Sequence, residues 1–265
     1  AISVGVAAIP EGLPIIVTIA LAIGVGRMAK KRAIVRKMAS IETLGAVQII
    51  LIDKTGTLTQ NTQRVKKFWL AQKNYLPSLL KACILGNTAS LIQRANKDSF
   101  EIVGSKTDGA LLLYAKSQLK DIEKVKKEGK IIDEYSFDHD RKTVTTVFEE
   151  NGKRNVFVRG APETVLENTK LGKTEKERIE KLFEEYAKEG FRVIGFGTKS
   201  HNESYSKREQ LEKDLEFLGF VGIYDPPRAE AKQAVEKARL AGIKTIMVTG
   251  DNELTALSVA KEVGL

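Results

Sequence analysis

The first 26 residues are almost wholly apolar, and their only charged side chain is Glu11. A helix of this length would reach roughly 39 Å at about 1.5 Å per residue, enough to cross a hydrocarbon core about 30 Å thick. Basic residues follow within a few positions: Arg27, Lys30, Lys31, Arg32, Arg36 and Lys37. Because Lys and Arg gather on the cytoplasmic side of membrane helices, we expect a transmembrane helix and stalk in residues 1–37 that lead into the cytoplasm.

Two prolines and a glycine interrupt this apolar segment at Pro10-Glu11-Gly12-Leu13-Pro14. Proline removes a backbone donor from the helical ladder and leaves carbonyl oxygens unbonded at membrane depth. Carbonyls beside a carboxylate are ligands preferred by a hard cation such as Ca²⁺, and an acid inside a membrane span commonly marks an ion pathway. We therefore interpret Glu11 as an ion ligand; a kinked structural helix with Glu11 near its end is the alternative.

Two short apolar runs rich in β-branched residues predict strands, each followed by an acid in a turn. The run 48–52, which we expect to be a buried parallel strand, leads into Asp53-Lys54-Thr55-Gly56-Thr57-Leu58-Thr59, and the run 245–248 leads into Thr249-Gly250-Asp251. Open α/β sheets bind ligands at the carboxyl ends of their strands, so the two turns are expected to share one phosphate site. Taken alone, either segment would also fit a plain structural turn.

The chemistry expected of this site is the transfer of a phosphoryl group to Asp53. A carboxylate can act as the nucleophile, and the reaction needs Mg²⁺, a nearby cation and backbone N–H groups around the phosphate oxygens. Lys54, Gly56 and the hydroxyls of Thr55 and Thr57 supply suitable groups. A site split in this way requires a domain inserted between two strands of one sheet.

The inserted segment mixes strand-like alternation at residues 143–148 and 155–158 with a helical pattern at residues 174–189. Thr174 and Glu177 have the spacing of a capping box at the start of that helix. Three short stretches fit nucleotide binding. The first holds Phe137, which can stack on adenine, and Lys142, which can attract phosphate; the second holds Arg159 and Gly160; and the third offers Asp108 to an adenine amino group.

Composition narrows the classes of partner. The chain has 43 Lys and Arg against 34 Asp and Glu, a net charge of +9, which suits an acidic partner such as a nucleotide or an anionic lipid. One cysteine and two histidines exclude a disulfide framework and a Cys/His zinc cluster. Aromatic residues make up only 6% without a basic-aromatic motif, so we expect no nucleic-acid partner.

In these motifs the chain resembles the catalytic core of P-type cation-transporting ATPases. Residues 53–59 match the phosphorylation loop of that family, and residues 10–14 match the fourth transmembrane helix of its calcium-pump-like branch. The resemblance implies that Asp53 is phosphorylated and that Thr55 holds phosphate and Mg²⁺. It also implies that the transported cation binds Glu11 together with the carbonyls of Val6, Ala7 and Ile9. By the same resemblance, Arg192 contacts phosphate, and Arg228 lies in the hinge motif Asp225-Pro226-Pro227-Arg228 and contacts the nucleotide.

The fold implied is α/β. It comprises an incomplete haloacid-dehalogenase-like Rossmannoid phosphorylation domain, an inserted α+β nucleotide-binding domain and an N-terminal transmembrane helix. The domains expected are a helix and stalk at 1–37, phosphorylation-domain segments at 38–63 and 223–265, and the nucleotide domain at 64–222. The chain departs from the family where Arg159 replaces a lysine, Asp108 a glutamate, His139 a basic residue and Gln63 a methionine, and the first of these puts nucleotide affinity in question.

The function implied is ATP-driven transport of a cation, with calcium the ion we expect, through an aspartyl-phosphate. Residues 27–44 would couple Asp53 to Glu11. The resemblance also implies an integral membrane protein with cytoplasmic catalytic domains. Its partners would be ATP, the lipid bilayer, and the actuator and further transmembrane parts of a longer chain. Two alternatives remain at this point: a soluble haloacid-dehalogenase-like phosphatase with a cap domain, and a membrane-anchored nucleotide-binding module.

Overall fold

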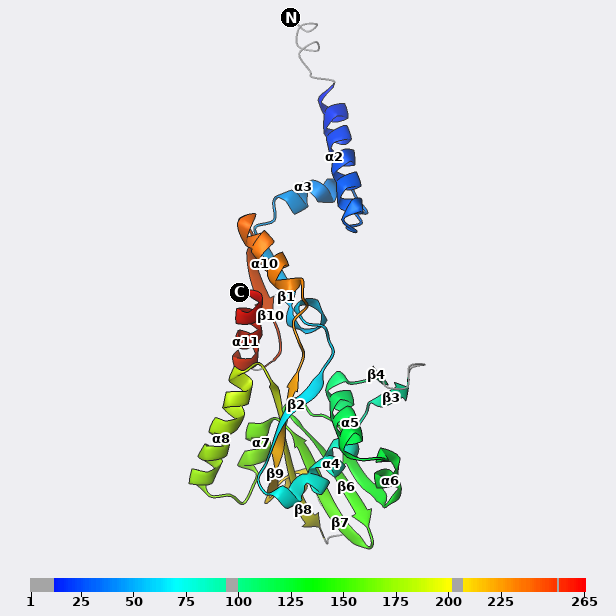
Figure 1. Ribbon diagram of the computed structural model, residues 1–265, viewed down its shortest axis with the longest axis vertical. Coiled ribbons are helices and arrows are strands. Elements are labelled where there is room, and N and C mark those ends of the chain that lie inside the picture. Colours follow the sequence, from blue (N-terminus) through cyan, green and yellow to red (C-terminus); the bar gives the residue numbers. More distant parts are fainter. Residues whose placement is uncertain (1–11, 94–99, 202–206, 252) are drawn as a thin grey trace, which may run out of the picture. The chain divides into compact units, whose positions relative to one another are not determined.

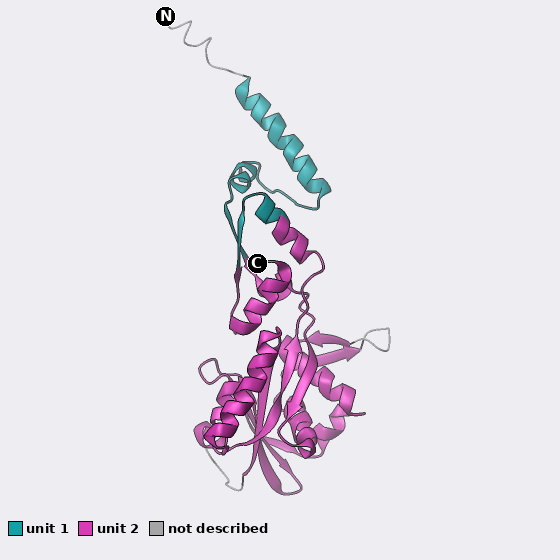
Figure 2. Cartoon of the chain, turned by 60° about the vertical axis from the view of Figure 1, so that its left-hand side comes forward, with its two compact units in different colours: residues 1–51, 237–246 teal, residues 52–236, 247–265 magenta. Residues whose placement is uncertain are grey.

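The computed structural model describes residues 12–93, 100–201, 207–251 and 253–265. The chain divides into two compact units, coloured separately in Figure 2. The smaller unit comprises residues 1–51 and 237–246, and the larger comprises residues 52–236 and 247–265. The division falls within strands β1 (Ile49–Asp53) and β10 (Lys244–Val248) and within helix α10 (Ala231–Leu240).

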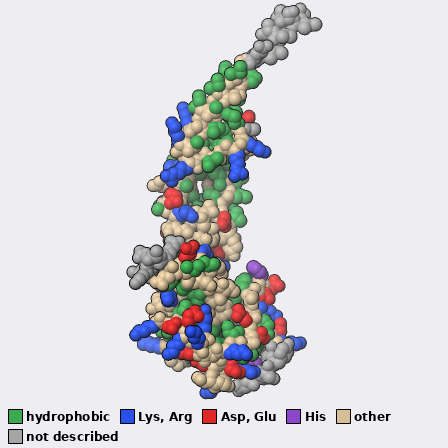
Figure 3. All heavy atoms as spheres, turned by 90° about the vertical axis from the view of Figure 1, so that its right-hand side faces the viewer, with side chains coloured by type: hydrophobic (Ala, Val, Ile, Leu, Met, Phe, Trp, Pro, Cys, Tyr) green, Lys and Arg blue, Asp and Glu red, His purple; other side chains and the backbone are tan. Residues whose placement is uncertain are grey.

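The smaller unit begins with α2 (Leu13–Lys30), which has Pro14 in its first turn, and continues to α3 (Ala39–Gly45) (Figure 1). Hydrophobic side chains gather over α2, with basic side chains near one end (Figure 3). Among the described residues, α2 is the one helix long and apolar enough to cross a membrane by length and composition. The helix ends where Arg32 takes the left-handed conformation (φ 63°) and the N–H of Ala33 bonds to the carbonyl of Met28.

Strands β1 and β10 pair as a two-stranded sheet, and the N–H of Lys244 bonds to the carbonyl of Gln48 at 2.8 Å. Both predicted strands are confirmed. The expectation that the first strand is buried is wrong, because alternate residues of both strands are exposed, including Leu51 (68%) and Val248 (53%). Residues on the other face join a small core: Ile52 and Met247 pack against Leu58, Ala231, Val235 and Val263. Each strand therefore buries only one face.

A six-stranded antiparallel sheet dominates the larger unit (Figure 1). The strand order is β2-β9-β8-β7-β6-β5, and Arg64 at the start of β2 lies opposite Tyr224 at the end of β9. The chain therefore enters and leaves the sheet by neighbouring strands. Their bounds are β2 (Arg64–Leu70), β5 (Lys130–Tyr135), β6 (Thr143–Glu150), β7 (Lys153–Gly160), β8 (Arg192–His201) and β9 (Glu216–Tyr224). A separate hairpin pairs β3 (Ser90–Gln93) with β4 (Phe100–Val103).

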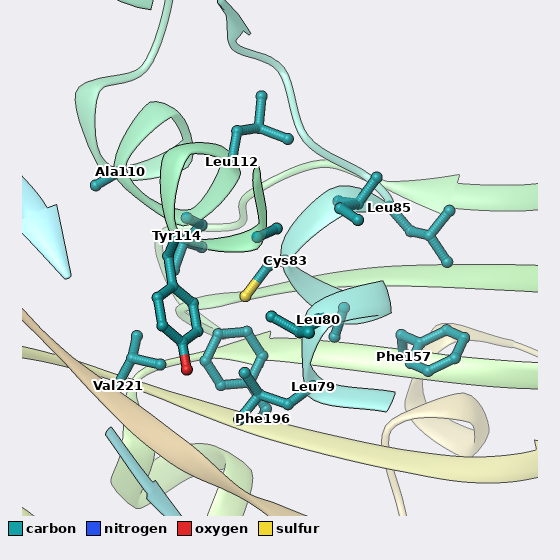
Figure 4. Close-up of a cluster of buried hydrophobic side chains, with 14 of the residues drawn as sticks. Leu79, Leu80, Cys83, Leu85, Ala110, Leu112, Tyr114, Phe157, Phe196 and Val221 are labelled. Atoms are coloured by element: carbon teal, nitrogen blue, oxygen red, sulfur yellow. The ribbon is translucent and has the colours of Figure 1, made fainter. Parts of the chain in front are cut away.

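Helices cover both faces of this sheet (Figure 1). They are α4 (Leu76–Ile84), α5 (Lys106–Gln118), α6 (Ile122–Lys127), α7 (Pro162–Glu167), α8 (Lys173–Lys188) and α9 (Arg208–Leu211), with a short 3₁₀ turn at Lys73–Tyr75. Helix α11 (Glu253–Val263) instead joins the small core beside β1 and β10 through Val263. Side chains of one strand alternate between two cores: Phe157 packs with α4 and α5, whereas Val156 and Val158 pack with α7 and α8. The first core contains Cys83, which points toward Tyr114 and Phe196 (Figure 4).

The helical pattern at residues 174–189 forms α8, but the capping box predicted there is wrong. The helix begins at Lys173 with Gly172 as its N-cap and has no side-chain cap. Thr174 therefore lies inside the first turn, where its hydroxyl cannot cap the helix. Ile179, Phe183 and Ala187 form the buried face of α8, and the spacing of these residues explains why the sequence predicted the helix itself.

Candidate active site

The turn Lys54–Leu58 after β1 places Asp53 at an exposed strand end. Gly56 adopts φ 80°, which a side chain would oppose, and its N–H donates to the hydroxyl oxygen of Thr59 at 3.2 Å. Thr59 is fully buried, and its hydroxyl donates to Asp225 Oδ2 at 2.7 Å. The turn is thus shaped by a hydrogen bond to a residue far along the chain.

Asp225 and Arg228, the first and last residues of the motif 225–228, form further hydrogen bonds to this turn and to the residues that follow it. Asp225 Oδ1 accepts the N–H of Thr62 at 2.9 Å, and Asp225 is only 8% exposed. Arg228 donates its backbone N–H to the carbonyl of Leu58 at 2.8 Å and Nη2 to the carbonyl of Gly56 at 2.9 Å. The sequence suggested that Arg228 contacts the nucleotide; here its guanidinium binds the turn that follows Asp53.

The two predicted halves of the phosphate site meet through an ion pair between Lys54 and Asp251. Both side chains are more than nine-tenths buried, and Arg192 Nη1 lies 3.6 Å from the other Asp251 oxygen. The N–H of Asp251 donates to the Thr249 hydroxyl at 3.2 Å, which fixes the turn after β10. Asp53, Thr55 and Gly250 are exposed and are the sequence neighbours of this pair. The exposed carboxylate of Asp53 and the paired side chains of Lys54 and Asp251 therefore all belong to the ends of β1 and β10.

Two of the predicted nucleotide stretches also lie together. Thr143 pairs with Gly160 across β6 and β7, and the N–H of Ala161 bonds to the carbonyl of Lys142 at 3.0 Å. A Cβ on Gly160 would collide with that carbonyl oxygen, so only glycine allows this approach. Phe137 is 54% exposed and the Lys142 side chain is exposed, so both are open to a ligand.

Hydrogen bonds within the loop between β5 and β6 give it a fixed conformation. Asp138 Oδ1 accepts the N–H of Arg141 at 3.0 Å and of Asp140 at 2.8 Å, and these bonds hold the pKa of the Asp138 carboxyl below its usual value. Lys142 follows in the left-handed conformation (φ 55°) and donates its N–H to the Asp138 carbonyl at 2.7 Å. The turn therefore sets where Phe137 and Lys142 stand.

Arg159 and Asp108, both expected to meet the nucleotide, bind each other. Arg159 is 5% exposed; Nη2 donates to Asp108 Oδ1 at 3.0 Å and to the carbonyl of Gly86 at 2.8 Å, and Nη1 donates to the carbonyl of Leu85 at 3.0 Å. Asp108 Oδ2 accepts the hydroxyl of Thr88 at 2.8 Å. In this arrangement the guanidinium satisfies carbonyls just beyond the C-terminus of α4, a role normally left to capping residues.

Sequence reasoning placed Thr59 and Asp225 within two longer motifs but did not identify the hydrogen bond by which they shape the turn after Asp53. It gave no role to Arg208 and Glu212, which lie beside the loop after β5. An Arg and a Glu four residues apart on a helix form an ordinary surface pair, so the last two carried no functional signal. Glu11, Val6, Ala7 and Ile9 lie outside the described residues.

A divalent metal could be held by a small part of this site. In the described ranges, no group of three or more His, Cys, Asp or Glu residues is arranged to hold a metal ion. Mg²⁺, however, commonly takes only one or two carboxylates together with substrate phosphates and water. Asp53 at the end of β1 offers one exposed carboxylate, and Thr55, two residues later, is also exposed, so the two residues fit that requirement.

Comparison of the sequence with known proteins identifies the family to which it is similar. A family model described as the P-type ATPase cytoplasmic domain N matches residues 75–230. The whole chain is 35% identical to a calcium-transporting ATPase of Bacillus subtilis and covers 34% of it. It is 38% identical to calcium-transporting ATPase 1 of Bacillus cereus and 37% identical to calcium-transporting ATPase 1 of Saccharomyces cerevisiae, and it covers 32% of each. The chain thus spans about a third of the length of the relatives that it matches.

Proposed function

Because the chain belongs to the P-type ATPase family, we propose that it is the catalytic core of an ATP-driven cation transporter that works through an aspartyl-phosphate on Asp53. The observation that carries the proposal is the buried Lys54–Asp251 pair, which joins the turn after Asp53 to the turn after β10. A phosphate beside Asp53 would lie next to two cations, since Lys54 and Arg192 both contact Asp251. Such fixed charges stabilise a transferring phosphoryl group.

The step proposed is a displacement at phosphorus. A carboxylate oxygen of Asp53 attacks the γ-phosphorus of ATP, the bond from that phosphorus to the β–γ bridging oxygen breaks, and ADP leaves with the electron pair. Water later attacks the aspartyl-phosphate, releases inorganic phosphate and restores the carboxylate. Mg²⁺ held by Asp53 and Thr55 would neutralise charge on the phosphate oxygens. Thr59 and Asp225 keep Asp53 in place through the hydrogen bond at 2.7 Å that shapes the turn.

For the nucleotide we propose a pocket in the larger unit, at the loop between β5 and β6. Phe137 would stack on adenine and Lys142 would meet phosphate, because both are exposed and fixed by the same turn. Gly160 would allow the ring to approach the backbone. Arg159 and Asp108 would act from beneath the pocket, where their bond at 3.0 Å supports the end of α4.

The ion we propose is calcium, since the relatives reported above carry the name of calcium-transporting ATPases. Glu11 and the carbonyls of Val6, Ala7 and Ile9 would be its ligands in the membrane, and α2 would continue that span toward the cytoplasm. The proposal places the protein in a membrane, with the site at Asp53 on the cytoplasmic side. A soluble phosphatase is disfavoured by the length and apolar surface of α2.

The test is labelling of the complete transporter with ATP carrying a radioactive γ-phosphate. We expect acid-stable, hydroxylamine-sensitive labelling that requires Mg²⁺ and disappears in Asp53→Asn. The matched control is Asp133→Asn, which alters a carboxylate on β5 whose own bond is a local one to the N–H of Glu134 at 2.9 Å; it should leave labelling intact. Persistent labelling in Asp53→Asn would show that another residue accepts the phosphate. The identity of the transported cation is tested by comparing ATP-dependent uptake of calcium into vesicles with uptake of sodium or protons.

A further inference from the structure

One guanidinium holds both ends of the loop that carries Phe137 and Lys142. Arg208 Nη2 donates to the carbonyl of Thr143 at 2.9 Å, and Nη1 donates to the carbonyl of Ser136 at 3.4 Å. Ser136 is the first residue after β5 and Thr143 is the first residue of β6, so the two carbonyls lie on either side of Phe137 and Lys142. The planar fork of arginine can span two acceptors in this way, whereas a lysine ammonium acts as a single point of charge.

Arg208 is itself fixed by a buried partner. Its Nε donates to Glu212 Oε1 at 2.7 Å, and the side chains of Arg208 and Glu212 are 12% and 8% exposed. The same carboxylate oxygen accepts the hydroxyls of Thr143 at 3.0 Å and Thr145 at 2.5 Å. Charge-assisted bonds away from water are stronger than surface pairs, and the guanidinium also lies 5.5 Å from the centre of the Tyr135 ring.

A second arginine connects the loop to the same short helix. Arg141, within the loop, pairs with Glu209 at 2.5 Å and lies 3.6 Å from Glu212 Oε2. Arg208 Nη1 in turn lies 3.7 Å from Asp138 Oδ2. The loop is thus tied to α9 at both flanking carbonyls and at two of its own side chains, although more than sixty residues separate it from α9 in the sequence.

We propose that Arg208 and Glu212 are positioning residues for nucleotide binding, which hold the loop so that Phe137 and Lys142 are already placed for adenine and phosphate. The inference rests on the nucleotide pocket proposed above. Ordering a mobile side chain at a binding site weakens affinity, so a loop fixed in advance binds more tightly than a loop that must be ordered by the ligand.

The experiment compares Arg208→Gln and Arg208→Lys in the complete transporter and measures phosphoenzyme as a function of ATP concentration. We expect the ATP concentration for half-maximal labelling to rise about tenfold in Arg208→Gln and a few-fold in Arg208→Lys. The maximal labelling should stay unchanged, because the atoms around Asp53 are untouched. The matched control is Arg154→Gln, since Arg154 pairs with Glu149 at 2.6 Å in the same sheet; its half-maximal concentration should match that of the wild type.

A double-mutant cycle that combines Arg208→Gln with Phe137→Leu distinguishes an effect through the loop from a nonspecific loss of structure. If Arg208 acts through the loop, Arg208→Gln should add little to the loss already caused by Phe137→Leu. Full additivity, or an unchanged half-maximal ATP concentration in Arg208→Gln, would overturn the inference. Failure of the proposed function would give a different result from failure of this inference. In that case the wild type itself would show no hydroxylamine-sensitive label that depends on Asp53.

Discussion

Replacement of Arg159 by methionine should destabilise the larger unit severely. Methionine fills much of the same volume but donates no hydrogen bond, so the carbonyls of Leu85 and Gly86 lose their donor and Asp108 loses its counter-charge. Removal of one partner from a buried ion pair costs about 3–5 kcal/mol, most of it from the charge left unpaired. The Asp108 side chain is 15% exposed, so water can relieve part of this cost, and we expect a loss of about 3 kcal/mol.

The assay uses the single tryptophan of the chain. Trp69 lies on β2 and stacks on Phe220 with a ring-centroid distance of 5.3 Å, so its fluorescence reports on the six-stranded sheet. Urea unfolding in mild detergent should show a lower midpoint for Arg159→Met at an unchanged slope. Arg154→Met removes an arginine from a more exposed pair, 30% and 35% exposed, and should lose less than about 1 kcal/mol.

A double variant tests the physical cause. Asp108→Asn removes the negative charge, so Arg159→Met in that background should cost clearly less than in the wild type. If Arg159→Met alone loses under about 1 kcal/mol, the pair behaves as a surface pair and the reasoning from burial fails. The same result would make Arg159 a candidate for direct contact with the nucleotide.

Two further predictions concern Cys83 and Gly160. Burial raises the pKa of the Cys83 thiol from 9.0 to about 12, so the folded chain keeps this proton to higher pH than the unfolded chain; the stability linked to Cys83 should be present below about pH 9 and lost as the pH rises toward 12. The free energy of unfolding should therefore decrease more between pH 8 and pH 10 in the wild type than in Cys83→Ala. An equal decrease in the two proteins would contradict the raised pKa of Cys83. Gly160→Ala should raise the ATP concentration for half-maximal labelling at least several-fold, because its methyl group would displace the Lys142 carbonyl. In Gly172→Ala the new methyl group meets no atom of the described residues within 4 Å, so this control should leave that concentration unchanged. Equal values in the two variants would show that the close approach at Gly160 does not shape the pocket.

The sequence by itself determined the local elements and the chemistry attached to them. Alternation and β-branched runs predicted β1, β10 and the β6–β7 segments, and the helical spacing of apolar residues predicted α8, because these periods reflect which faces are buried. Asp53 could be placed at a strand end for the same reason. The capping box at Thr174 failed because a helix boundary depends on one or two residues, and Gly172 began the helix earlier than the pattern suggested.

Only the tertiary structure decided which side chains meet. Arg159 and Asp108 look like two separate nucleotide ligands in the sequence, yet strand register and helix packing bring them into one buried pair. Lys54 reaches Asp251, and Arg208 reaches both ends of a loop on another strand pair. Local sequence sets the conformation of a few neighbouring residues. A buried charge finds its partner only after distant segments have packed, and burial then decides whether that charge serves the fold or a ligand.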